Sequence, residues 1–318
     1  MSRSIFSSYL FESMRKVIGI GETLLDIIFR NNQPEKAIPG GSTFNGMISL
    51  GRCNVPALFI SELGNDRVGC LLRDFMQENN LSTEFIDFFD EGSTPVSLAF
   101  LDENQQAEYQ FFRDFPKQRL QMTFPEINAG DIFIISSYFA VNPVLREKVY
   151  GLVRYAKQQK AIVYYDINFR KAHASERTLL LPFFLENFAN ASIVRCSEED
   201  LETLFPSETV EAVYRKYIAP RCEIFIVTHG KEAIQLKTPV FEKDYPVEEI
   251  IPVSTIGAGD NFNAGISYGF MKKGILLDDL TQLNEKQWDE LMAEGQAFAK
   301  AACLSVENFV SKDFAKLK

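Results

Sequence analysis

From residue 131 onward, the chain alternates between short apolar runs rich in β-branched residues and longer segments with helical spacing. Strands that are apolar at nearly every position are buried on both faces, which is typical of a parallel sheet covered by helices. The predicted strands are 131–136, 161–166, 192–196 and 224–228, and the predicted helices are 143–159, 179–189, 209–218 and 285–304. This alternation predicts an α/β fold in which a mostly parallel central sheet lies between two layers of helices.

The N-terminal part of the chain carries a different pattern. Two strand-like runs follow each other at 95–101 and 107–112, and the polar residues 102–106 between them are typical of a hairpin loop. The remaining predicted elements are strands at 17–21 and 58–64 and helices at 42–50 and 68–79. The adjacent strands predict a small β-sheet beside the main one.

The organisation of the chain is expected to be simple. No linker rich in proline or glycine and no internal repeat divides residues 14–318, so we expect one domain over this range. Within it, the segments at about 22–40 and 94–114 are expected to form a small β-sheet lid. Residues 1–13 lack the apolar core and cleavage site of a signal peptide and are expected to be an N-terminal extension. Met1 and Met14 both remain open as the start of the native protein.

A stretch of small residues, Gly257, Ala258 and Gly259, runs directly into the carboxylate of Asp260, and a helix-compatible run follows. Small residues let backbone N–H groups approach an anion, and a helix N-terminus adds partial positive charge. A carboxylate there repels an anion, so its natural role is to accept a proton from a hydroxyl that attacks the anion. Phosphoryl transfer to an alcohol requires this combination of an anion cradle and a base. The alternative is a glycine-rich turn with Asp260 as a helix cap.

Ligands of open α/β sheets bind beyond the carboxyl ends of the strands. Asp26, Asp166, Ser197 and Thr228 lie at or near the ends of strand-like runs. We therefore expect these four residues to contribute to one site.

The stretch 254–265 resembles the C-terminal signature of the ribokinase-like (PfkB) sugar kinases, usually Asp-Thr-x-Gly-Ala-Gly-Asp. The resemblance covers about residues 14–310 and implies a three-layer αβα ribokinase-like fold. It also implies that Asp260 is the catalytic base and that the backbone of Gly257, Ala258 and Gly259 forms the anion hole. Ser254 stands where family members carry an Asp near a bound monovalent cation, which makes a requirement for such a cation doubtful.

Two N-terminal features resemble the sugar-binding part of the same family. Gly40, Gly41 and Asn45 match the signature Gly-Gly-x-x-x-Asn, which implies close approach of the backbone to a sugar and amide contacts to its hydroxyls. Asp26 resembles the family's substrate Asp, which grips two sugar hydroxyls. The alternative for the glycine motif is a helix start with Ser42 or Thr43 as its cap.

Two arginines resemble positions shared by fructokinases and 2-keto-3-deoxygluconate kinases. Arg170 ends an Asp-x-Asn-x-Arg segment that begins at Asp166, and Arg113 ends a lid segment that begins at Tyr109. The resemblance implies substrate binding by both, and Arg170 could pair with a phosphate or a carboxylate. An ordinary surface ion pair is the alternative for Arg170.

The resemblance also implies a nucleotide site for ATP with Mg²⁺. The residues that it assigns to ATP are Ser197, Thr228, Gly230 and Asn263. Asp200 stands where the family has a Glu that organises Mg²⁺ through water. An acidic helix N-terminus capped by Ser197 explains the same residues equally well.

Composition excludes several other classes of function. The net charge is −10 without a run of Lys or Arg, which argues against nucleic acid and anionic membranes as partners. No apolar run approaches the roughly 20 residues that span a bilayer. Five cysteines without a CxxC pair and only two histidines leave no credible zinc site. Free thiols in a reducing cytoplasm are the expected state of the cysteines.

The sequence therefore predicts an ATP-dependent sugar kinase that phosphorylates a primary hydroxyl of a ketohexose, with fructose as the first substrate. The alternative substrate is 2-keto-3-deoxygluconate. A sugar-binding regulator without turnover should have lost the base or the anion hole, and a nicotinamide oxidoreductase shares only the α/β pattern. We also expect a homodimer, because the exposed edge of the lid is a natural pairing surface.

Overall fold

The computed structural model describes residues 14–101 and 107–318. The predicted N-terminal extension 1–13 and the predicted hairpin loop 102–106 lie outside the described residues.

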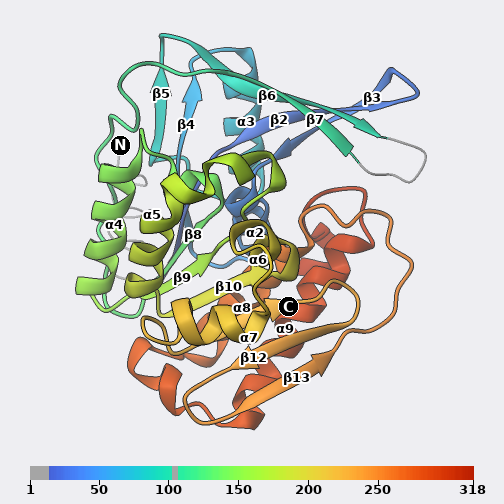
Figure 1. Ribbon diagram of the computed structural model, residues 1–318. Helices are drawn as coiled ribbons and strands as arrows, with labels where there is room; N and C mark the ends of the chain where they lie inside the picture. Colours follow the sequence, from blue (N-terminus) through green and yellow to red (C-terminus); the bar gives the residue numbers. More distant parts are fainter. Residues whose placement is uncertain (1–13, 102–106) are drawn as a thin grey trace.

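The main sheet has nine strands, and its central part is parallel (Figure 1). In spatial order the strands are β13 (Glu242–Pro246), β12 (Ala233–Lys237), β11 (Phe225–Thr228), β10 (Ile193–Ser197), β9 (Ile162–Asp166), β8 (Ile132–Ser136), β1 (Val17–Ile20), β4 (Ala57–Gly64) and β5 (Ile86–Phe89). Only β12 and β13 run antiparallel to their neighbours, at one edge. The mostly parallel sheet that the sequence predicts is thus confirmed.

Helices cover both faces of this sheet, because successive side chains of each buried strand point to opposite faces. In β9, for example, Tyr164 packs into one apolar cluster and Tyr165 into the other. The first cluster is completed by α2 (Ser42–Arg52), α3 (Arg67–Glu78), α8 (Ala258–Lys273), α9 (Glu285–Cys303) and α10 (Lys312–Ala315). The second is completed by α4 (Arg146–Gln158), α5 (Arg177–Asn190), α6 (Glu198–Leu204) and α7 (Val210–Val213). The result is the predicted three-layer αβα arrangement.

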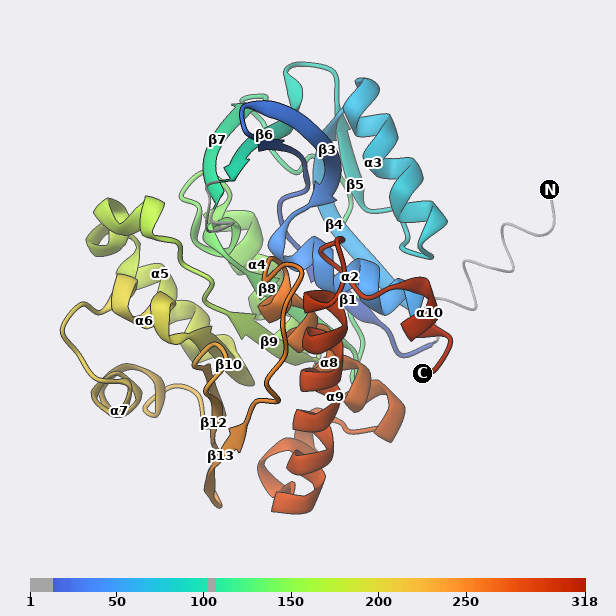
Figure 2. The ribbon, with the colours of Figure 1, turned by 90° about the vertical axis from the view of Figure 1, so that its right-hand side faces the viewer.

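A second, four-stranded sheet lies at the opposite end of the molecule from β12 and β13 (Figures 1 and 2). Its strands, in spatial order, are β3 (Gln33–Gly40), β2 (Leu24–Arg30), β6 (Ser93–Leu101) and β7 (Ala107–Asp114). They come from the two segments that the sequence assigns to a lid. The two edge strands are β3 and β7.

The sequence placed Asp26 both in the segment 22–40 of the small sheet and among residues at the ends of main-sheet strands, and the structure agrees with the first and corrects the second. Strand β1 ends at Ile20, and Asp26 lies inside β2 of the small sheet, opposite Ile38 of β3 and Ser97 of β6. The physical reason is that the apolar run 24–30 finds its hydrogen-bonding partners in the small sheet. The other three residues, Asp166, Ser197 and Thr228, do end parallel strands.

A few elements differ from the predicted ones. Helix α4 begins at Arg146 rather than at 143, and the predicted helix 209–218 is α7 followed by a π-helical turn, Tyr214–Ile218. The short or polar strands β5, β12 and β13 were not predicted. Among the described residues, no helix is long and apolar enough to cross a bilayer.

Candidate active site

The glycine-rich stretch forms the start of helix α8. Gly257 precedes the helix in the left-handed region, with φ of 80°, and a Cβ there would lie 2.5 Å from the carbonyl oxygen of Asn308. The position therefore requires glycine. The N–H of Ala258 donates to the carbonyl of Thr255 in this turn, at 3.2 Å. The first-turn N–H groups that follow, beginning with Gly259, have no partner within a helix and can serve an anion.

Asp260 lies in the first turn of α8 and is partly buried. Its Oδ2 accepts a hydrogen bond from Nδ2 of Asn45 on α2, at 2.9 Å. Burial, opposed by this hydrogen bond and reinforced by the charge of Asp166, raises the pKa of Asp260 to about 7. A carboxylate with such a pKa is matched to general-base work near neutral pH.

Asn45 therefore touches the predicted base as well as occupying a predicted sugar position. The side chain is buried, and its Oδ1 has no hydrogen-bond partner within residues 14–101 and 107–318. Because buried acceptors are nearly always satisfied, this oxygen is available for the hydroxyl of a ligand.

A buried ionic network lies beneath the start of α8. Asp166 on β9 and Arg195 on β10 are opposite each other in the sheet register, and Nη1 of Arg195 lies 3.0 and 3.1 Å from the two carboxylate oxygens. Nη2 of Arg195 donates to Oγ1 of Thr228 at 2.6 Å. Asn263 of α8 donates to Asp166 at 2.7 Å and accepts from the Tyr164 hydroxyl at 3.0 Å. The network joins two of the residues assigned to ATP, Thr228 and Asn263.

The small sheet brings a second carboxylate toward the same region. Asp26 Oδ2 lies directly beside Gly40, the last residue of β3, and Gly41 then caps α2. Asp26 Oδ1 accepts a hydrogen bond from the Ser97 hydroxyl. Burial raises the pKa of Asp26 to about 6, with a smaller contribution from the charge of Glu22. The predicted sugar residues Asp26, Gly40 and Gly41 are thus brought together at the start of the helix that carries Asn45.

The two predicted arginines have different surroundings. Arg113 on β7 makes a two-pronged ion pair with Glu22, in which Nε and Nη2 lie 2.6 and 2.9 Å from the two carboxylate oxygens. Arg170 is exposed and makes no ion pair with any residue that the structure describes. Its charge nevertheless acts on Asp260 and on Tyr109 of β7. Of these two arginines, Arg170 is therefore the one that can meet an anionic group of a ligand.

Ser197 and Asp200 form the helix cap that the sequence offered as one reading. The Asp200 N–H donates to Ser197 Oγ at 3.1 Å, and Asp200 Oδ2 accepts from the N–H and hydroxyl of Ser197 at 2.8 and 2.7 Å. Asp200 is buried, and burial raises its pKa. Gly230 lies in an exposed turn after β11. The described residues include no group of three or more acidic, histidine or cysteine side chains that could hold a metal ion.

Three residues of this region were not identified in the sequence analysis, and these are Arg195, Glu22 and Ser97. Arg195 left a usable signal, because a charge inside the apolar run 193–196 must have a buried partner. Glu22 and Ser97 left none, since their partners lie 91 and 71 positions away along the chain.

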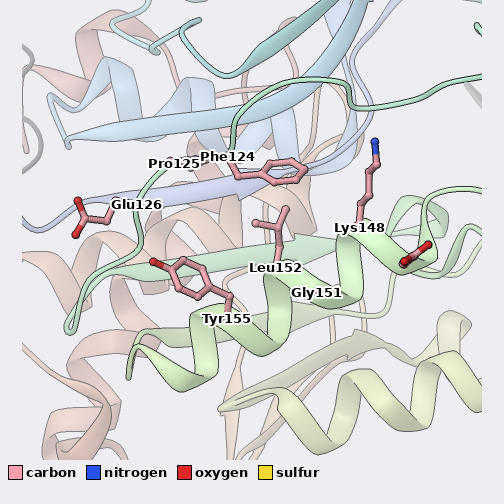
Figure 3. A pocket seen from close by; sticks show the side chains of 8 residues that line it. Phe124, Pro125, Glu126, Lys148, Gly151, Leu152 and Tyr155 are labelled. Atoms are coloured by element: carbon pink, nitrogen blue, oxygen red, sulfur yellow. The ribbon is translucent and has the colours of Figure 1, made fainter.

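A separate hollow of about 680 Å³ lies between helix α4 and the segment 124–126 (Figure 3). Phe124 and Leu152 project into it, as the close view shows. Its lining contains none of the predicted site residues. The chemistry of the chain is therefore to be sought at the start of α8 rather than in this hollow.

Comparison with known proteins identifies the family of the chain and the fold that it shares with them. Residues 14–309 match the family described as "pfkB family carbohydrate kinase". Among curated relatives, the "Probable fructokinase-6, chloroplastic" of Arabidopsis thaliana is 25% identical over 282 residues, which cover 85% of this chain and 73% of the relative. The fructokinase of Rhizobium leguminosarum bv. trifolii is 25% identical over 259 residues, which cover 79% of this chain and 78% of the relative.

Solved structures show the same fold. The fructokinase of Vibrio cholerae O395, in a form with fructose, ADP and calcium ion bound, aligns with a TM-score of 0.80 at 21% identity, over 94% of this chain and 96% of that one. The aminoimidazole riboside kinase of Salmonella enterica, complexed with aminoimidazole riboside and an ATP analog, aligns with a TM-score of 0.79 at 20% identity, over 95% and 98%. At these identities the likeness concerns the fold.

Proposed function

The chain belongs to the pfkB family of carbohydrate kinases, which makes it a phosphotransferase acting on a sugar hydroxyl, and from this premise we propose that it transfers the γ-phosphoryl group of ATP to a primary hydroxyl of fructose. The observation that carries the proposal is the position of Asp260. Its carboxylate, with a pKa of about 7, lies one residue beyond the first free N–H groups of α8 and against Asn45. Base and anion cradle therefore share one turn of one helix.

In the proposed reaction, the sugar hydroxyl oxygen forms a bond to the γ-phosphorus while the bond from that phosphorus to the β,γ-bridging oxygen breaks. Asp260 takes the hydroxyl proton, and ADP leaves with the bridging oxygen. Backbone N–H groups at the start of α8, beginning with Gly259, meet the negative charge on the phosphoryl oxygens. Such donors are effective because they are fixed before the charge develops.

The residues fit a magnesium ion that arrives with the nucleotide. Mg²⁺ commonly keeps several waters and is held by one or two carboxylates together with substrate phosphates, so a preformed cluster of ligands is not needed. We assign Asp200 to this ion, with a water molecule between them. Both hydrogen bonds from Ser197 go to Oδ2 of Asp200, so Ser197 does not occupy Oδ1. When bound, the ion would neutralise charge on the phosphate oxygens.

The residues proposed to bind the sugar favour a neutral substrate. Asp26 and Asn45 offer a carboxylate and an unpartnered amide oxygen to hydroxyl groups. Glu22 neutralises Arg113, which removes one of the two cations that could hold an acid sugar. Arg170 keeps 2-keto-3-deoxygluconate as the second candidate, because its guanidinium makes no ion pair in the described part of the chain.

The same proposal includes a lid, a homodimer and a cytoplasmic location. The small sheet would serve as the lid, and its edge strand β7 exposes Tyr109, Phe111 and Phe112. An aromatic strand edge of this kind favours pairing with a second copy of the chain, which supports a homodimer. Five free cysteines support the cytoplasm as the compartment.

The test is ADP release with Mg·ATP across fructose, 2-keto-3-deoxygluconate, ribose, tagatose and adenosine. The proposal expects turnover on fructose to exceed turnover on each of the others. Preferred turnover on 2-keto-3-deoxygluconate would replace fructose by the acid sugar and make Arg170 its carboxylate partner. Binding of a sugar without turnover on any of them would favour a non-catalytic regulator and contradict the proposal.

A further inference from the structure

The position of Arg195 has a consequence for the anion hole. We propose that Arg195 is a phosphate-positioning residue whose buried guanidinium lies behind Gly259 and supplies fixed positive charge to the phosphoryl group. This inference rests on the proposed function, because it assumes that the start of α8 receives a phosphate.

The first observation is the contact between Arg195 and Gly259. A Cβ built on Gly259 would lie 2.8 Å from Nη1, 3.0 Å from Nη2 and 3.2 Å from Cζ of Arg195. The guanidinium therefore packs directly against the backbone of the loop that forms the cradle. Only the absence of a side chain at position 259 leaves room for it.

The second observation is that this place is unfavourable for a cation in a protein without a ligand. The N-terminus of α8 carries partial positive charge, which repels a guanidinium. Burial adds a desolvation cost, since only 7% of the Arg195 side chain remains exposed. Asp166 offsets this cost by an ion pair, but Asp166 also accepts a hydrogen bond from Asn263. An anion at the cradle would face both the helix terminus and the guanidinium.

The third observation is that Arg195 has hydrogen-bonding capacity to spare. A guanidinium has five N–H donors. Within the described residues, its hydrogen bonds run from Nη1 to Asp166 and from Nη2 to Thr228, and its buried Nε has no partner. Because Thr228 is one of the residues assigned to ATP, the guanidinium links the nucleotide side of the site with the phosphoryl side.

The overall charge of the chain favours such a residue. With a net charge of −10 and no basic run, the site for a nucleoside triphosphate must create its own positive potential. Arg113 and Arg195 are both paired with a carboxylate, but only the Arg195 guanidinium packs against Gly259 of the cradle. Arg170 is exposed to solvent, where salt screens its field. Arg195 is buried beside the cradle, where screening is weak.

The test compares Arg195→Gln with Arg195→Lys, because both disturb the fork geometry and only the lysine keeps the charge. We expect kcat to fall by about 10²–10³-fold in Arg195→Gln, the size of losing one oxyanion donor, and by about tenfold in Arg195→Lys. The dissociation constant of fructose should stay within about twofold in both, since Arg195 bonds to Asp166 and Thr228 and to neither Asp26 nor Asn45, the residues proposed to hold the sugar. Equal losses of kcat in the two variants would overturn the inference.

The pH dependence of kcat gives a readout that a structural role would not move. The groups that act on Asp260 are Asn45, Asp166, Arg170 and Arg195. The charge of Arg195 lowers the pKa of Asp260, so Arg195→Gln should move the acid limb of the profile to higher pH, while Arg195→Lys leaves it in place. An unmoved limb in Arg195→Gln would contradict the electrostatic role.

Arg146→Gln is the matched control. Arg146 is a buried arginine that pairs with Glu186 and Asn187 between α4 and α5, so its loss reports the cost of breaking a buried pair elsewhere. It should lower the melting temperature without changing the acid limb.

Two further measurements keep the inference open to refutation. If Arg195→Gln does not fold, wild-type kcat at saturating substrates and constant KCl should change less than about twofold between about 50 and 500 mM added tetramethylammonium chloride, because a buried charge is poorly screened. A steep fall of kcat with salt would overturn the inference. If wild type phosphorylates no sugar of the panel, calorimetry with Mg·ATP and adenosine separates the two proposals. Arg195→Gln should then bind Mg·ATP more weakly than wild type and adenosine equally, and unchanged Mg·ATP binding would contradict the inference.

Discussion

The start of α8 and the small sheet place charged residues around the proposed active site in opposite ways. Beneath α8, Asp166 and Arg195 are almost fully buried and tied to both the sheet and the helix. At the small sheet, Glu22, which precedes β2, and Arg113 of β7 form an ion pair in which 25% and 35% of the two side chains are exposed. Buried pairs are fixed and costly to break, whereas exposed pairs contribute little to stability.

The contrast separates two tasks. Phosphoryl transfer needs donors and charges that do not move while charge develops, and in the proposed mechanism the buried network provides them. Recognition of a sugar needs contacts that can differ between substrates, and the small sheet can change these without disturbing the main core. Substitutions beneath α8 should therefore alter turnover, and substitutions on the small sheet should alter which sugar is preferred.

The largest effect is expected from Asp260→Asn, which removes the proposed base and keeps the shape of the side chain. We expect kcat to fall by about 10²–10⁴-fold, the usual value of general-base catalysis, with fructose binding nearly unchanged. Single-turnover phosphorylation together with calorimetric fructose binding measures both. Near-normal turnover would mean that another group takes the proton.

The same substitution should change stability in a pH-dependent manner. Burial raises the pKa of Asp260 from 3.8 to about 7, so its charged form is disfavoured in the folded state. This penalty is absent below the unfolded pKa and fully present above the folded one. Asp260→Asn should therefore melt at a higher temperature than wild type at pH 8, and the gain should fade toward pH 4.

Gly259→Ala is expected to have the next largest effect. The added methyl group would lie 2.8 Å from Nη1 of Arg195, so loop and guanidinium must separate. We expect a loss of about 10²-fold in kcat, because the cradle donors shift from their fixed positions. Gly151→Ala in α4 is the control, since nothing lies within 4 Å of its new methyl group and alanine is the better helix former. Equal kcat in both variants would show that the cradle tolerates displacement.

Asp26→Asn should act mainly on sugar binding. Hydrogen bonds to a charged group contribute about 1.5–3 kcal/mol, so the KM for fructose should rise by about 10–100-fold, with a smaller change in kcat. Steady-state kinetics at saturating ATP measures KM for fructose and kcat separately. A kcat loss as large as that of Asp260→Asn would remove the distinction between the two regions.

Glu22→Gln is expected to give the smallest effect on fructose. The exposed pair with Arg113 is worth at most about 1 kcal/mol, so kcat/KM for fructose should change less than about fivefold. The freed guanidinium should, however, improve kcat/KM for 2-keto-3-deoxygluconate, whose carboxylate it can bind. Glu35→Gln, which breaks the exposed pair with Arg30 on the small sheet, is the control. A larger loss on fructose without gain on the acid sugar would make Glu22 a structural residue.

The sequence predicted the main sheet better than the site, for a physical reason. Strands such as β8 and β9 are buried at every residue, and that burial is written into their composition. The polar strand β13 has no such pattern, because it lies at an edge and only Tyr245 is buried. Burial thus leaves a local signal, and edge pairing does not.

Within the site, single motifs could be recognised but their contacts could not. The stretch around Asp260 is continuous in sequence, so its turn and helix are encoded locally. The hydrogen bond from Asn45 and the position of Arg195 behind Gly259 join segments far apart in the chain. Such contacts depend on how α2, α8 and β10 pack, which periodicity alone does not specify.

The most direct test of the account is the pH dependence of kcat/KM for fructose between pH 5 and 9. With Asp260 as the base, activity should fall about tenfold per pH unit below a midpoint near 7 and level off above it. Asp26→Asn distinguishes the second carboxylate, with its pKa of about 6, because a limb that persists in this variant belongs to Asp260. The account predicts that the limb persists in Asp26→Asn, and a profile that stays flat down to pH 5 would contradict it.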